Sequence, residues 1–314
     1  MLIVNATPNL YGITLQGDYQ DLNELYDSIS RYLSFYEVNE DKFPYHEYEF
    51  LLSLNYDIRH AYQGDREQLT VDNNASAFKD LSTYFSEGSE DQRECLKIYK
   101  NHKNGNLYYS VEILYPLVFH YLSAFTMILD DYYLDSWFDN KSMEMPPEYT
   151  VLQAEHDRAQ IQLLVTLFWD NISSALGKAF AASAYHYLSG EAIIFPYSLY
   201  VQALLHYQLA VYPQLTPEQR KDFLRVSLLE IFGSDSLKEE TRSFKHLREN
   251  YKTAIRNIES IKDNKLNTFF TFAEGAAFLS DVIQAHDGKL YHEDFEQALT
   301  ERFGVDVDWD QLEM

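Results

Sequence analysis

Ionisable and polar side chains of several kinds are concentrated in one short segment, residues 56–66. The segment contains two arginines, one histidine, two aspartates and two tyrosines, and Gly64 is predicted to end its helix. An arginine in such a cluster can clamp carboxylates of its own chain, or it can present its planar fork to an anionic ligand. The candidate structural or ligand-binding residues are Asp57, Arg59, His60, Tyr62, Gln63 and Arg66.

The two alternatives differ in what they predict for Arg59. A short helix of this composition has little apolar surface, so its polar groups must find partners in the tertiary fold. We therefore expect Arg59 to be substantially buried and paired with a carboxylate, and its removal would then cost about 3–5 kcal/mol. If Arg59 instead binds a ligand, Arg59→Ala should keep or raise the melting temperature and abolish the binding of an anion.

A second group of carboxylates follows a predicted aromatic helix at Asp130, Asp131 and Asp135. Carboxylates at this spacing can hold Mg²⁺ against a diphosphate, and the group resembles the first metal motif of class I terpene synthases. Those enzymes need a second motif that ends in a glutamate, and the nearest match, at 170–174, has Lys178 in that place. We therefore predict a solvated helix end here and no divalent-ion site.

Other motifs of catalytic and metal sites are incomplete in this sequence. Residues 287–295 resemble the second half of an EF-hand, but Ile283 and Ala285 stand at the first and third ligand positions and offer no side-chain oxygen. The ten histidines form no His-Glu-x-x-His or Glu-x-x-His pair, and Cys95 has no evident base beside it. We predict no metal and no cofactor, and the sequence favours a protein that is not an enzyme.

The net charge of the chain argues against some classes of binding partner. Its 314 residues include 25 Lys and Arg against 49 Asp and Glu, a net charge of −24, so its surface repels nucleic acids and anionic membranes. Residues 113–129 are apolar but slightly short for a membrane span. A single cysteine and a start without a secretory pattern indicate a reducing, cytoplasmic location.

Periodicity separates the chain into two parts. Alternating residues predict strands at 2–4, 10–16, 47–54 and 106–115, with helices at 55–63 and after Asp18 and Pro116. From 146–147 onward the pattern is helical, with helices predicted at 155–188, 197–211, 216–232, 236–262, 266–285 and 293–302.

These elements predict an α+β fold, with a small N-terminal β-sheet and helices followed by a larger all-α helical bundle. The predicted division is an α+β region over 1–138, a linker over 139–150 and an α-helical region over 151–314. The alternative is that both regions pack as one unit.

Several short motifs carry a resemblance to a known family. They are Thr7-Pro8-Asn9-Leu10 with Gly12, Gly17-Asp18-Tyr19, Asp21-Leu22, residues 56–64, residues 106–110 and Tyr115-Pro116. Over roughly the first 130 residues they resemble an uncharacterised bacterial family of unknown function. The resemblance implies no activity, cofactor or catalytic residue.

Without a catalytic set, the sequence favours a soluble acidic protein that acts by protein–protein interaction. Residues 236–265 carry eight Lys and Arg against five Asp and Glu, whereas 287–314 carry two against nine. These segments could meet within one chain or between two copies, so a protein partner or a homo-oligomer is expected. The alternatives are a small-molecule binding protein or enzyme with a pocket between the two regions, and an acidic mimic of nucleic acid.

Overall fold

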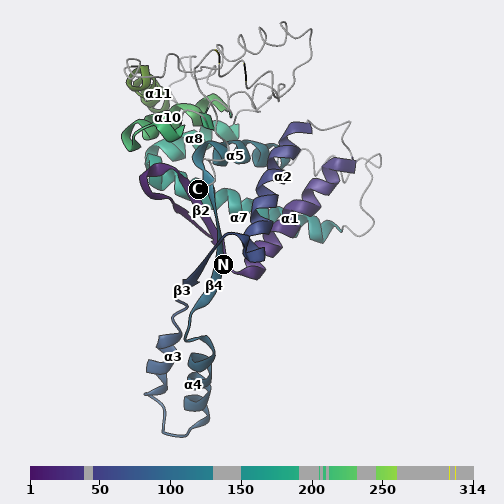
Figure 1. The fold of residues 1–314 in the computed structure, drawn as a ribbon, viewed down its shortest axis with the longest axis vertical. Coiled ribbons are helices and arrows are strands. Elements are labelled where there is room, and N and C mark those ends of the chain that lie inside the picture. Colours follow the sequence, from purple (N-terminus) through teal and green to yellow (C-terminus); the bar gives the residue numbers. More distant parts are fainter. Residues whose placement is uncertain are drawn as a thin grey trace.

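The chain folds into a helical body from which a slender arm projects (Figure 1). The computed structural model describes residues 1–38, 45–129, 150–190, 205, 208–209, 212–231, 245–259, 297 and 301. An antiparallel sheet lies in the N-terminal part, and helices make up most of the remaining described residues. The predicted α+β fold class is therefore confirmed.

The sheet has four antiparallel strands in the order β1-β2-β4-β3. They are β1 (Ile3–Ala6), β2 (Gly12–Gly17), β3 (Glu67–Val71) and β4 (Asn106–Leu114). Strand β4 is the longest: residues 109–114 pair with β2, and residues 106–110 pair with β3. Leu107 at its outer end is exposed, whereas Ile113 at its inner end is buried. The outer half of β4 therefore leaves the body as a two-stranded ribbon with β3, which we call the stalk.

Helices surround the inner half of the sheet. They are α1 (Tyr19–Val38), α2 (Tyr45–His60), α5 (Tyr115–Leu129), α7 (Val151–Leu176), α8 (Lys178–Gly190), α10 (Pro217–Ile231) and α11 (Lys245–Glu259). Short turns occur at η1 (Pro8–Leu10), η3 (Ala61–Asp65) and η4 (Tyr212–Gln214).

Predicted helix starts are formed by side-chain caps. The amide of Asp21 donates to Asp18 Oδ1 at 2.9 Å, and the amide of Asp18 donates back to Asp21 Oδ2 at 3.1 Å. Thr216 and Gln219 form the same reciprocal arrangement at the start of α10. In both places a polar side chain satisfies amides that the first helical turn leaves unpaired.

One hydrophobic cluster joins the two predicted regions. Its buried residues run from Leu2 in the N-terminal part to Ile258 in α11, and they include Phe119 of α5 and Phe168 of α7. The sheet, α1 and α7 therefore share one core. Residues 139–149 of the predicted linker lie outside the described residues, and the domain boundaries stay a prediction.

Two local predictions are wrong. Residues 47–54 were expected as a strand but lie within α2, because Leu51, Leu54 and Ile58 recur at helical spacing and are buried on one side. The predicted helix over 155–188 is broken at Gly177, whose φ of 99° is open to glycine but strained for other residues. All strands within the described residues precede α5, as expected.

The arm itself was not predicted. It comprises residues 72–105, in which α3 (Ala75–Ser82) and α4 (Glu90–His102) form an antiparallel helical hairpin at the end of the stalk. Figure 1 shows this hairpin standing clear of the body. None of its residues belongs to the body's hydrophobic cluster.

Candidate functional site

The predicted polar cluster lies where α2 ends and η3, a π-helical turn, begins. Asp57 and Arg66 form an ion pair at 3.1 Å, and His60 Nδ1 lies 2.9 Å from Asp65 Oδ2. Gln63 is exposed. The structure therefore brings most of the predicted residues together at one turn, although they form several separate contacts.

Arg59 does not behave as the predicted carboxylate clamp. It is half-buried, and its guanidinium lies 5.0 Å from the centre of the Tyr56 ring. Among the described residues, no ion pair involves Arg59, and the carboxylate of Asp57 pairs with Arg66. The helix buries Ile58 and Ala61, so it has more apolar support than its composition suggested.

Two buried nitrogen atoms beside the π-turn, Arg59 Nε and His60 Nε2, lack a hydrogen-bond partner within the described part of the chain. Such turns occur often at functional sites. Burial raises the pKa of the Asp57 carboxyl despite the opposing influence of Arg66 and His60.

Tyr62 points from the same turn toward α1. Its ring packs edge-on against Tyr19 and Tyr26, with centroid distances of 5.5 and 5.8 Å. Burial raises the pKa of its hydroxyl, and the nearby Tyr26 and Asp27 act in the same direction. This aromatic group anchors the turn on α1.

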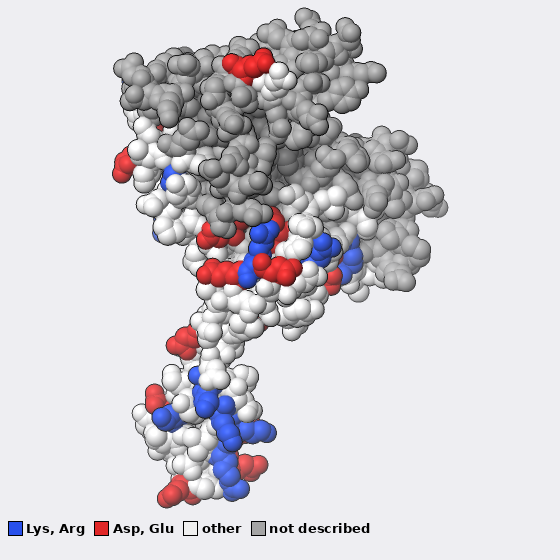
Figure 2. All heavy atoms as spheres, viewed as in Figure 1, with Lys and Arg blue, Asp and Glu red and all other residues white. Residues whose placement is uncertain are grey.

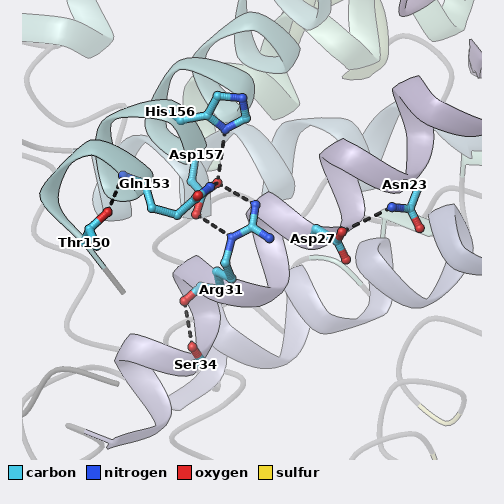
Figure 3. A network of polar contacts seen from close by, with 8 residues as sticks. All are labelled: Asn23, Asp27, Arg31, Ser34, Thr150, Gln153, His156 and Asp157. Atoms are coloured by element: carbon cyan, nitrogen blue, oxygen red, sulfur yellow. Dashed lines mark hydrogen bonds and ion pairs between the residues drawn. The ribbon is translucent and has the colours of Figure 1, made fainter. Parts of the chain in front are cut away.

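An ion pair between distant helices, in which the carboxylate is buried, was not predicted. Arg31 of α1 donates two hydrogen bonds, at 2.8 and 2.9 Å, to Asp157 of α7, which has no exposed surface (Figure 3). Gln153 donates a third at 3.0 Å. Burial alone would raise the pKa of Asp157, but the bonds from Arg31 and Gln153 and the charge of Arg31 hold it below its usual value. The pair fixes α1 against α7.

A buried arginine, Arg220, holds the turn after β1. Arg220 of α10 donates to the carbonyl oxygens of Asn9, Tyr212 and Pro213, and its guanidinium lies 3.5 Å from the centre of the Tyr11 ring. Asn9 has a φ of 58°, a left-handed conformation that needs such support. The motif around 7–12 is therefore a structural joint between the sheet and α10.

The arm exposes apolar side chains and buries small ones. Its buried residues are Ala75, Ser82 and Cys95. Its exposed large apolar residues are Phe78, Leu81, Tyr84 and Leu96, and Tyr84 is 84% exposed. Helices of this length need tertiary packing to be stable, and α3 and α4 pack on each other with few fully buried side chains.

The base of the arm is nevertheless well fixed. Asn73 donates to the carbonyl of His102 at 3.1 Å and to Asn106 Oδ1 at 3.0 Å, and its own Oδ1 caps α3 through the amide of Ala75. Gly105 has a φ of 80°, and a Cβ there would lie 2.6 Å from the Val71 carbonyl oxygen. The stalk therefore presents the hairpin in a defined direction.

The charges of the arm are also unusual for this chain. Residues 72–105 carry five Lys and Arg and six Asp and Glu, nearly neutral beside a total of −24. Figure 2 shows basic side chains along the length of the arm, with acidic ones beside them and at its far end. Ser89 caps α4 by accepting a hydrogen bond from the amide of Gln92, so the Ser-x-x-Gln pattern is a signal in the sequence that could have located the start of this helix.

The other sites considered from the sequence cannot be described in the structure. Asp130, Asp131, Asp135 and residues 287–295 lie outside the described residues. Within them, no group of three or more His, Cys, Asp or Glu is placed to hold a metal ion. No helix in the described ranges has the length and apolar composition to cross a membrane.

Comparison with known proteins gives a family but no activity. No curated protein and no solved structure matches the chain. A family model described as a domain of unknown function, DUF6904, matches residues 2–267. The match confirms the expected uncharacterised family and extends it well beyond the first 130 residues. The chain belongs to this family, DUF6904.

Proposed function

We propose that the protein acts by binding another protein through its arm, in the cytoplasm and without a catalytic step of its own. The observation that supports this function is a helical hairpin that projects on a stalk and exposes Phe78, Leu81 and Tyr84 while burying only small residues. Aromatic and aliphatic side chains gathered on a projecting element are typical of interaction sites.

The attachment of the arm supports the same function. A hairpin that served only as a connection between β3 and β4 would need two residues, because Val71 and Asn106 are directly paired. The connection instead contains residues 72–105, and the hydrogen bonds of Asn73 at its base fix the orientation of the hairpin. A defined orientation lowers the entropy lost when a partner binds.

Site-specific photo-cross-linking in the producing cells tests this function. The photoreactive residue p-benzoylphenylalanine would replace Tyr84 in the arm or, as the matched control, Leu152 of α7, which is 82% exposed. We expect discrete protein adducts, identified by mass spectrometry, from position 84 and none from position 152. Absence of adducts at position 84, or equal adducts at both positions, would contradict the function.

A second candidate function is the binding of a small anion at the π-turn. It is favoured by the unpartnered Arg59 Nε and His60 Nε2 of the polar cluster. A carboxylate or phosphate oxygen could accept a hydrogen bond from the arginine and interact with the imidazole.

A thermal-shift series with acetate and inorganic phosphate tests the second candidate. Because a ligand of the native state raises its melting temperature, wild type should respond and Arg59→Gln should not. Arg93→Gln on the arm is the matched control and should respond like wild type. Equal responses from all three proteins would exclude the site.

A further inference from the structure

Helix α4 carries a row of charges on its outward side. Glu90, Arg93, Glu94 and Lys97 recur at intervals of three and four residues, so they share one side of the helix, and all four are exposed. They line a single open hollow of about 470 Å³. Cys95, which points elsewhere, is buried.

Within their own helix these charges have both like and opposite neighbours. Like charges stand four residues apart, Glu90 before Glu94 and Arg93 before Lys97, whereas opposite charges stand three residues apart, Glu90 before Arg93 and Glu94 before Lys97. None of the ion pairs among the described residues involves these four side chains. Arg93 donates instead to the carbonyl of Gly88, at 2.7 and 3.1 Å.

The row of charges is complementary to a second copy of itself that runs in the opposite direction. If a second α4 lies antiparallel, with a two-fold axis between residues 93 and 94, Glu90 faces Lys97 of the second copy and Arg93 faces Glu94 of the second copy. The axis repeats both contacts, so each of the four charges meets an opposite one. A closed, two-fold contact of this kind is the commonest form of oligomer interface.

Antiparallel arms also place apolar groups together. Tyr84 lies at the far end of the arm and would approach the stalk of the second copy, where Lys103 and Leu107 are exposed. Tyrosine can pack against both, through a cation–π contact and through apolar burial. Such burial is needed because exposed ion pairs contribute little affinity and mainly set the orientation.

We propose that the arm is a homodimerisation element in which two copies of the chain pair their α4 helices antiparallel through these charges. The inference rests on the proposed function, because it names the partner that the arm binds as a second copy. It makes the charged row a determinant of self-recognition.

Two charge-reversed variants of the full chain test the inference. One carries Arg93→Glu and Lys97→Glu, which makes the row wholly acidic, and the other carries Glu90→Lys and Glu94→Lys, which makes it wholly basic. Sedimentation equilibrium over a concentration series would measure the self-association of each and of their equimolar mixture. Lys178→Glu with Lys252→Glu, both exposed on the body, is the charge-matched control for the acidic variant.

We expect wild type and the body control to dimerise, and each reversed variant to bind itself at least about tenfold more weakly. The equimolar mixture should recover the wild-type affinity, because all four contacts are then opposite again. Circular dichroism would establish that both variants are folded.

Three results would overturn the inference: a monomeric wild type, reversed variants that dimerise normally, or a mixture that stays monomeric. Cross-linking of residue 84 to a different protein, together with a monomeric wild type, would leave the proposed function standing and remove the homodimer.

Discussion

The body and the arm are ordered by different means. The body surrounds its sheet with large side chains that have almost no exposed surface, such as Phe119, Phe125 and Phe168. The arm has no such residue, and its helices depend on caps and on the hydrogen bonds of Asn73 at its base. The comparison indicates that the body is stabilised by its own packing, whereas the arm leaves large apolar side chains exposed, as the proposed binding function requires.

The largest effect is expected from breaking the ion pair between Arg31 and the buried Asp157. Arg31→Met keeps the apolar stem but removes the charge and both hydrogen bonds that Arg31 supplies to the buried Asp157 carboxylate. Removal of one partner from a buried pair costs about 3–5 kcal/mol, which urea unfolding would measure. The matched arginine in the arm is Arg93, and Arg93→Met should cost less than about 1 kcal/mol because that side chain is exposed.

The same ion pair predicts a pH dependence. The pKa of Asp157 is lowered in the folded state, so the stability that the carboxylate contributes is present above its unfolded value, near 4, and is lost as the pH falls through the folded pKa. The difference between wild type and Arg31→Met should therefore narrow as the pH is lowered below about 4. A constant difference down to acid pH would show that the charge of Asp157 is not responsible.

A smaller effect is expected at the joint between the sheet and α10. Arg220→Met leaves the carbonyl oxygens of Asn9 and Pro213 without their donor, which should cost about 2–4 kcal/mol. Arg220→Lys restores one donor and should recover part of the loss. Lys221→Met, at the neighbouring half-buried position, is the control and should change the unfolding free energy by less than about 1 kcal/mol.

Sequence reasoning succeeded where a local signal determines the structure. Asp18 and Thr216 cap helices as predicted, and Pro116 lies at the start of the helix that follows β4. The candidate polar residues come together because they belong to one turn. Their chemistry was harder to predict, since the choice of Arg66 over Arg59 as the partner of Asp57 depends on where the π-turn directs each side chain.

Contacts between distant segments could not be predicted in this way. Arg31 and Asp157 are 126 positions apart, and nothing in either local sequence identifies the other. The arm was missed for a different physical reason. Hydrophobic periodicity identifies a helix by the core it packs on, and α4 has no such core, so only its cap at Ser89 marked its start.

The smallest effect on stability is expected from removing the whole arm. Replacing residues 72–105 by Asn-Gly would join Val71 to Asn106, which are directly opposite in the ladder, through a two-residue turn suited to a hairpin. Because the arm shares no residue with the body's hydrophobic cluster, the melting temperature of the body should stay within about 3 °C of wild type.

A Gly-Ser linker of equal length in place of the arm is the matched control, since it removes the helices but keeps the loop long. Both proteins should retain the cooperative unfolding of the body in calorimetry, and both should lose the self-association proposed for the arm. If removal of the arm instead lowered the melting temperature by ten degrees or more, about 3 kcal/mol of the body's stability would come from the arm. The arm would then be a structural support, and the contrast between a self-sufficient body and a partner-dependent arm would no longer hold.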